Sequence, residues 1–252
     1  MNYPHACINF DSKAFGACRK LFSPEEMTKL QDIMKIKMVE TILRTHNLTF
    51  QHSAETTPLS FADILIKPSQ HSLVLGDSGT GKTTLLHLLG GLSHPTGGTV
   101  HLCDQNLYAL SDSALDRFRA QNVGFIFQEA HLLPNLSIME NIQLAQHLAK
   151  RKQDNERIWS ILEKLQLAEQ AKKLPHQVSR GQLQRAAIAR AIVNEPQLLL
   201  ADEPTASLDD NNTERVLELL LDTADVYRST LVIATHDKRI KDHFSNTYNL
   251  QV

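Results

Sequence analysis

The segment "GDSGTGKTT", residues 76–84, has the composition and spacing of a loop that binds the phosphates of a nucleotide. It fits the pattern G-x-x-x-x-G-K-[ST] between an apolar run and an expected helix. Glycines let backbone N–H groups surround phosphates, the lysine reaches the β- and γ-phosphates, and the following hydroxyl binds Mg²⁺. We therefore predict a phosphate-binding loop formed by Gly76, Asp77, Ser78, Gly79, Thr80, Gly81, Lys82, Thr83 and Thr84.

A pair of acidic residues ends the apolar run "LLLADEP" of residues 198–204. Two adjacent carboxylates at the end of a buried strand are costly unless a cation or a reaction requires them. A strand that simply ends in polar residues is the alternative, and it explains one acid better than two. We predict that Asp202 helps to hold Mg²⁺ and that Glu203 orients or deprotonates the attacking water.

A third apolar run, "LVIATHD" of residues 231–237, ends at His236. A single histidine is more often structural than functional. Ligands of open α/β sheets, however, bind outside the carboxyl ends of the strands, where Lys82 and Glu203 are also expected. We therefore predict a functional role for His236.

The segment "VSRGQLQRAAIAR", residues 178–190, begins with residues that favour a helix start. Ser179 is the predicted N-cap, because its hydroxyl can accept a hydrogen bond from the first turn. With Gly181 in that turn, exposed N–H groups and the positive end of the helix dipole favour an anion. The sequence alone does not say which anion, or on which chain it is held.

Apolar strands that alternate with helices must position these residues. Such an alternation predicts a largely parallel sheet covered on both faces. Strand-like segments lie at residues 41–50, 61–68, 71–76, 97–104, 123–127, 197–202, 229–237 and 247–252. Helix-like segments lie at residues 81–92, 112–121, 140–151, 157–172, 179–190 and 214–227.

The first 38 residues differ from the rest of the chain, and we interpret them as an N-terminal extension ahead of a domain at residues 39–252. "SPEEMTKLQDIM" predicts a short helix capped by Ser23, with Pro24 at its first position. Met34 and Met38 are also credible translation starts, so part of the extension is alternatively a misassigned start.

Composition excludes several function classes. The 252 residues contain 26 Lys and Arg against 28 Asp and Glu, so no bulk positive charge indicates nucleic acid as a partner. The longest apolar runs are far shorter than the ~20 residues that span a bilayer. Cys7, Cys18 and Cys103 lack C-x-x-C spacing, which favours reduced thiols over a zinc site or a disulfide framework.

The order of "GDSGTGKTT", "FIFQEAHLLP", "VSRGQLQR", "LLLADEPTASLD" and "IATHD" resembles the nucleotide-binding subunits of ATP-binding cassette (ABC) transporters, from about residue 39 onward. The resemblance implies an α/β P-loop NTPase cassette with a mainly parallel core sheet, an antiparallel β subdomain and a helical signature subdomain. It also implies ATP hydrolysis, with ATP and Mg²⁺ as ligands.

The same resemblance implies the roles of individual residues. The catalytic set is Lys82, Gln128, Glu203 and His236, and the Mg²⁺ set is Thr83, Gln128 and Asp202. Phe50 takes the place of the aromatic residue that stacks on adenine. The helix start at residues 179–182 faces the γ-phosphate of ATP held by a second subunit, which implies a homodimer in the ATP-bound state. Ser179 and Gly181 would complete the partner's site, and the resemblance also assigns Gln182 and Asp209 to nucleotide binding, the latter as the D-loop aspartate.

Two departures occur in the signature segment, where Val178 replaces the usual Leu and Arg180 replaces the first Gly. Val keeps an apolar anchor, whereas Arg adds a long cation beside a phosphate site. Because Ser179 and Gly181 are retained, we expect an active site.

Finer resemblance, as in "LLHLLGGLSHPTGGTVHL", is to the compact ATPases of lipoprotein-releasing, macrolide-exporting and cell-division complexes. Such subunits pair with an integral membrane permease that has a large extracytoplasmic domain, which implies a place on the cytoplasmic face of the inner membrane and no nucleic-acid partner. Three alternatives remain: an importer ATPase, a soluble ABC ATPase of DNA repair or translation, and a nucleotide-dependent switch with negligible turnover.

Overall fold

The structure is a computed structural model that describes residues 41–250 except 54, 56 and 207. All statements below concern these residues. The helix predicted within residues 23–34 lies outside them.

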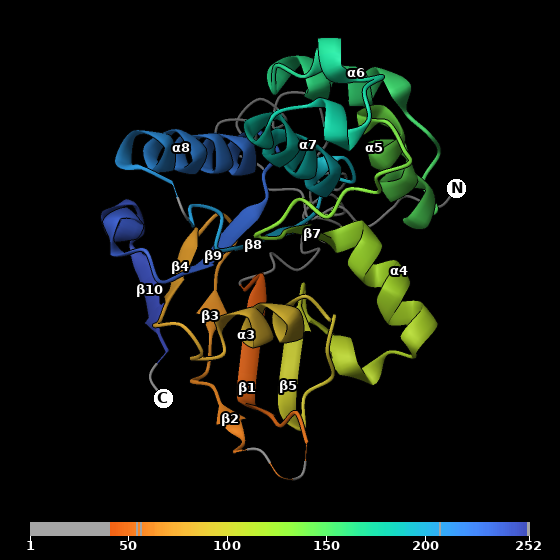
Figure 1. Ribbon diagram of the computed structural model, residues 1–252. Coiled ribbons are helices and arrows are strands. Elements are labelled where there is room, and N and C mark those ends of the chain that lie inside the picture. Colours follow the sequence, from red (N-terminus) through yellow and green to blue (C-terminus); the bar gives the residue numbers. More distant parts are fainter. Residues whose placement is uncertain (1–40, 54, 56, 207, 251–252) are drawn as a thin grey trace, which may run out of the picture. The chain divides into compact units, whose positions relative to one another are not determined.

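A parallel sheet of five strands forms the centre of the described fold (Figure 1). Its strand order is β10-β4-β9-β8-β7, and every neighbouring pair is parallel. The central strands β8 and β9 are buried along their whole length, as expected for strands covered on both faces. The strands are β4 (Ser72–Leu75), β7 (Val123–Ile126), β8 (Leu198–Asp202), β9 (Thr230–Thr235) and β10 (Asn246–Asn249).

A second sheet is antiparallel and is organised around β1, which pairs with β2, β3 and β5. The strands are β1 (Leu43–Phe50), β2 (Leu59–Ser60), β3 (Leu65–Ile66), β5 (Gly97–Leu102) and β6 (Gln105–Asn106). The predicted fold class is thus confirmed in both of its β parts. The strand expected at residues 61–68 is shorter than predicted, because only Leu65 and Ile66 pair with β1.

Six α-helices complete the described fold (Figure 1). They are α3 (Lys82–Leu89), α4 (Asp112–Asn122), α5 (Ile138–Leu148), α6 (Asn155–Lys164), α7 (Arg180–Ile192) and α8 (Asp210–Val226). Short 3₁₀ helices lie at Leu107–Ala109, Ala168–Gln170, Pro175–Gln177 and Lys238–His243. The helix expected at residues 157–172 ends at Lys164, because Gln166 adopts a left-handed backbone with φ 55°.

Alternation along the central strands divides the core into two hydrophobic clusters. Leu198 and Leu200 pack with α3 and the antiparallel sheet, whereas Leu199 and Ala201 pack with α5–α8. Helix α3 therefore lies between the two sheets, and α7 and α8 cover the opposite face of the parallel sheet. None of the described helices is long and apolar enough to cross a membrane.

Candidate active site

The phosphate-binding loop connects β4 to α3, as predicted. It occupies residues 76–81, and Lys82 is the first residue of the helix. Gly81 caps this helix with φ 89°, a left-handed conformation that costs other residues free energy. Thr80 closes the loop, since its hydroxyl donates a hydrogen bond to the carbonyl of Asp77 at 3.0 Å. The helix thus begins with N–H groups directed toward the loop, which favours an anion there.

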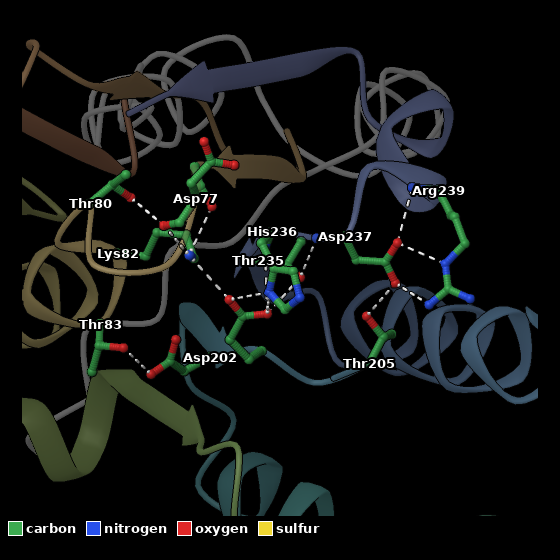
Figure 2. Close-up of polar contacts among 12 residues, drawn as sticks. Asp77, Thr80, Lys82, Thr83, Asp202, Thr205, Thr235, His236, Asp237 and Arg239 are labelled. Carbon is green, nitrogen blue, oxygen red and sulfur yellow. Dashed lines mark hydrogen bonds and ion pairs between the residues drawn. The ribbon is translucent and has the colours of Figure 1, made fainter. Parts of the chain in front are cut away.

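The Lys82 ammonium group is buried at the centre of this loop (Figure 2). Its Nζ donates to the carbonyl oxygens of Gly76 at 2.8 Å and Asp77 at 3.0 Å, and lies 3.2 Å from Oε1 of Glu203. The cation therefore connects the loop after β4 with the end of β8. The phosphate oxygens of a triphosphate bound in the loop would contact this positive charge.

Thr83 and Asp202 meet beside the lysine, as the prediction of a shared Mg²⁺ site requires. The Thr83 hydroxyl donates to Oδ2 of Asp202 at 2.8 Å, and Oδ1 of Asp202 is buried without a hydrogen-bond partner among the described residues. Burial raises the pKa of the Asp202 carboxyl. A hydroxyl and a carboxylate with an unpaired oxygen suit a hard cation, whose remaining ligands would be phosphate oxygens and water.

Glu203 directly follows β8 in a left-handed conformation with φ 47°, which is strained for a residue other than glycine. Its carboxylate accepts hydrogen bonds from the Thr235 hydroxyl at 2.8 Å and contacts Nδ1 of His236 at 2.9 Å. Burial alone would raise the pKa of Glu203, but the hydrogen bonds from His236, Thr235 and Lys82 outweigh it and lower the pKa. The carboxylate is therefore ionised at neutral pH and can accept a proton.

Strand register explains why Glu203 and His236 are neighbours. Asp202 of β8 lies opposite Ala234 of β9, so the residues that follow each strand emerge side by side. The His236 side chain is 53% exposed, and when its Nδ1 carries the hydrogen bonded to Glu203, Nε2 is free to face a ligand. The structure thus brings together Lys82, Thr83, Asp202, Glu203 and His236.

Two predicted residues form no hydrogen bond with this cluster in the part of the chain that the structure describes. Gln128 is exposed two residues beyond β7 and makes no hydrogen bond within the described part of the chain. Phe50 ends β1 in the antiparallel sheet, where its half-buried ring meets His52 edge to face at 4.7 Å between ring centroids. In the loop itself, Asp77 and Ser78 are exposed, and Thr84 is half-buried.

The signature segment forms no hydrogen bond with Lys82 or its loop among the described residues. Ser179 is the N-cap of α7 as predicted: its hydroxyl accepts from the Gln182 N–H at 3.3 Å, and the Gln182 side chain accepts from the Ser179 N–H at 2.9 Å. Arg180 and Gly181 are exposed, and no atom lies within 4 Å of where a Gly181 side chain would begin. Asp209 is the exposed N-cap of α8 and accepts from the Asn212 N–H at 2.9 Å.

Sequence reasoning missed three residues that support the site. Thr235 donates a hydrogen bond to Glu203, and the only feature of the sequence that could have indicated this role is a hydroxyl at the end of a predicted strand. Gln184 donates to the carbonyl of Pro204 at 2.9 Å. Arg239 pairs with Asp237 at 2.6 Å (Figure 2). It also pairs with Asp210 and so connects the loop after β9 with the start of α8. Long-range contacts of this kind have no local sequence pattern.

The fold and the site define a P-loop ATPase of the cassette type, and comparison with known proteins gives the family. The sequence profile described as "ABC transporter" matches residues 59–206, so the chain belongs to the ABC transporter family and is an ATP-binding ATPase subunit of that family. A similar curated protein is the "Lipoprotein-releasing system ATP-binding protein LolD" of Buchnera aphidicola subsp. Schizaphis graminum, with 36% identity over 203 residues, covering 79% of this chain and 89% of the relative.

Solved structures agree with this assignment. The dimeric structure of MJ0796, described as a bacterial ABC transporter cassette, has a TM-score of 0.73 and 30% identity, covering 82% of this chain and 94% of that one. A dimeric post-hydrolysis state of MJ0796 bound to ADP and Pi also has a TM-score of 0.73, with 29% identity, covering 83% of this chain and 94% of that one.

Proposed function

We propose that the chain hydrolyses MgATP at the cluster around Lys82 and Glu203, and that hydrolysis drives a membrane permease of the lipoprotein-releasing type. The observation that carries the proposal is the convergence of a buried ammonium group, an ionised carboxylate and an exposed imidazole at the ends of neighbouring parallel strands. Ligands of α/β sheets bind at such ends.

Each residue has a role in this proposal. Lys82 binds the β- and γ-phosphates together with the N–H groups of the loop, and Phe50 stacks on adenine. Thr83, Asp202 and Gln128 are the residues that would hold Mg²⁺, which would neutralise phosphate charge. Glu203 accepts a proton from water as the water oxygen bonds to the γ-phosphorus and the bond to the bridging β–γ oxygen breaks. His236 contacts the γ-phosphate through Nε2.

The site is completed by a second copy in this proposal. In the described part of the chain, no hydrogen bond joins Ser179, Gly181, Gln182 or Asp209 to the phosphate-binding loop, and the first turn of α7 is open to solvent. The dimeric form of the similar cassette MJ0796 supports an arrangement in which this turn meets ATP held by the partner subunit. One ATP would then be enclosed by residues of both chains.

The membrane partner is inferred from the relatives. LolD proteins are named as ATP-binding proteins of lipoprotein-releasing systems, so we infer a permease with a large extracytoplasmic domain as the partner of this chain. The chain would then be peripheral on the cytoplasmic face of the inner membrane. Residues 39–252 would form the ATPase domain, preceded by the extension of residues 1–38.

A reconstitution tests the function directly. The chain is co-expressed with a candidate permease of the lipoprotein-releasing type, reconstituted in lipid vesicles and assayed for phosphate release with Mg²⁺ and ATP. We expect hydrolysis that the permease stimulates and release of a lipid-anchored protein from vesicles that requires ATP. Hydrolysis that the permease does not stimulate would contradict the permease, and absence of hydrolysis in the assembled complex would contradict the catalytic role.

A further inference from the structure

Helix α7 carries the exposed signature turn at one end and, five residues beyond Ser179, a side chain that holds the turn containing Glu203. We propose that Gln184 is a positioning residue that makes the placement of Glu203 depend on engagement of the signature turn with the partner's ATP. This inference rests on the proposed function. It adds an internal connection between the two ATP sites of the dimer.

The first step is the contact itself. Nε2 of the half-buried Gln184 donates to the carbonyl oxygen of Pro204 at 2.9 Å. Pro204 directly follows Glu203, whose left-handed backbone with φ 47° persists only where its surroundings fix it. The Glu203 N–H donates to Ala234 at 2.8 Å, so β9 holds one side of the turn. Gln184 holds the other side, from outside the sheet.

The second step concerns the rigidity of α7. Its C-terminal half is buried, and its backbone approaches β7 so closely that a side chain at Gly124 would lie 2.5 Å from the carbonyl oxygen of Ala191. Arg190 further donates to the carbonyl oxygens of Ala130 at 3.0 Å and His131 at 2.6 Å, in the loop that follows Gln128. This half of the helix is therefore fixed to the sheet and to that loop.

The third step concerns the exposed end. The first turn of α7 has open space around Gly181, and Gln184 lies about 7.5 Å along the helix axis from Ser179 at 1.5 Å per residue. A triphosphate bound against this turn acts on a helix that is fixed farther along. If the bound triphosphate shifts this turn relative to the fixed half of the helix, Gln184 lies between the two and would pass the shift to the carbonyl of Pro204. Glu203 of one chain would thus be placed correctly once that chain has engaged its partner's ATP.

The experiment uses two variants of Gln184 in the full chain assembled with its permease. Gln184→Met keeps the length of the side chain and removes the donor, whereas Gln184→Lys keeps a donor of similar reach. We expect Gln184→Met to lower kcat about tenfold, with the KM for ATP within about twofold of wild type, and Gln184→Lys to restore most of the loss. Gln143→Met is the matched control, because Gln143 is equally half-buried and donates only to Asn155, at 3.0 Å.

A double-mutant cycle with Ser179→Arg tests the dependence on engagement. Ser179→Arg blocks the signature turn, so in that background Gln184→Met should change the residual single-turnover rate by less than about twofold. Equal losses in both backgrounds would mean that Gln184 only supports the fold, and an unchanged kcat in Gln184→Met would also overturn the inference. If wild type itself fails to hydrolyse ATP, the proposed function fails instead.

Discussion

Lys82 and Glu203 form an ion pair, with Nζ 3.2 Å from Oε1, and both side chains are almost fully buried. The pair joins the residue that would bind the γ-phosphate to the residue that would activate water. Because the same ammonium group also donates to two loop carbonyls, its donors are already used by its own chain. Nucleotide binding must therefore exchange these contacts for contacts with phosphate, which leaves Glu203 held by Thr235 and His236.

Replacing Lys82 with Ala should weaken ATP binding about 10- to 100-fold and abolish turnover, because charge-assisted hydrogen bonds contribute about 1.5–3 kcal/mol. Titration with a fluorescent ATP analogue and a phosphate-release assay measure the two effects. Unchanged affinity together with unchanged hydrolysis would exclude the loop of residues 76–84 from the mechanism.

Replacing Glu203 with Gln should trap a dimer with bound ATP. Loss of a general base lowers the rate by about 10²- to 10⁴-fold, while an amide keeps the shape of the side chain and can still accept from Thr235. Size-exclusion chromatography with Mg²⁺ and ATP should show a dimer peak. A variant that elutes with the nucleotide-free monomer would contradict this role for Glu203.

Asp202 illustrates a cost that function imposes on stability. Its raised pKa means that the folded state favours the protonated carboxyl. Burial of the ionised carboxylate therefore lowers the free energy of unfolding at any pH above the pKa of Asp202 in the folded state. This loss disappears as the pH falls below the pKa of Asp202 in the unfolded chain. Asp202→Asn should therefore raise the melting temperature of the nucleotide-free protein at pH 7 by about 2–4 °C, the shift that ~1 kcal/mol causes in a domain of about 150–250 residues.

The same Asp202→Asn variant should lose the additional stabilisation that Mg²⁺ gives in the presence of ATP. Differential scanning fluorimetry with ATP, with and without Mg²⁺, separates the two effects. If Asp202→Asn melts at a lower temperature than wild type without nucleotide, burial of the Asp202 charge is not the dominant effect of this residue on stability.

Much of the site could be predicted because Asp202 ends one strand with an apolar run and His236 follows another, and parallel strands present their carboxyl ends at one edge. Thr235 could not be predicted, since a threonine in a β-branched strand resembles any other core residue. The left-handed backbone of Glu203 has no sequence signal, because tertiary contacts impose it on a residue that does not favour it.

The fold was predictable to a similar extent. The capping box at Ser179 has a local pattern that marks the start of α7. By contrast, β10 contains Asn246, Thr247 and Asn249, and its pairing with β4 depends on hydrogen bonds between backbones that are far apart in the chain. The pairing of β10 with β4 depends on packing of the whole core, so a short stretch of sequence does not predict it.

Arg180 is exposed and forms no ion pair with the described residues, so pairing with a described acid of its own chain is excluded. We expect its cation to favour closure on the partner's ATP, and Arg180→Gly should weaken ATP-dependent dimerisation by up to about fivefold for each site, since exposed charge interactions contribute ~0–1 kcal/mol. Analytical ultracentrifugation over a range of ATP concentrations measures this change.

The control for Arg180→Gly is Ser179→Arg, which should prevent closure whatever Arg180 does. Identical dimerisation and ATPase curves for wild type and Arg180→Gly, with Ser179→Arg unable to dimerise, would show that the arginine is a tolerated surface residue.

A chain that begins at Met38 should fold and hydrolyse ATP like the full chain. The clustered active-site residues lie between Gly76 and His236, and the described core begins at Ile42. Circular dichroism and phosphate release with purified protein test this expectation. Aggregation or loss of hydrolysis would show that the first 37 residues bury core surface and that the proposed boundary is wrong.

The position of β4 in its sheet has a consequence for the order of events during synthesis. β4 leads into the phosphate-binding loop, yet its two neighbours are β9 and β10, from the last part of the described chain. The Leu250 N–H even donates to Leu75 at 2.7 Å, directly before the loop. On the ribosome, this loop therefore lacks its supporting strands until β9 and β10 have been synthesised, and we expect nucleotide to be captured only after that.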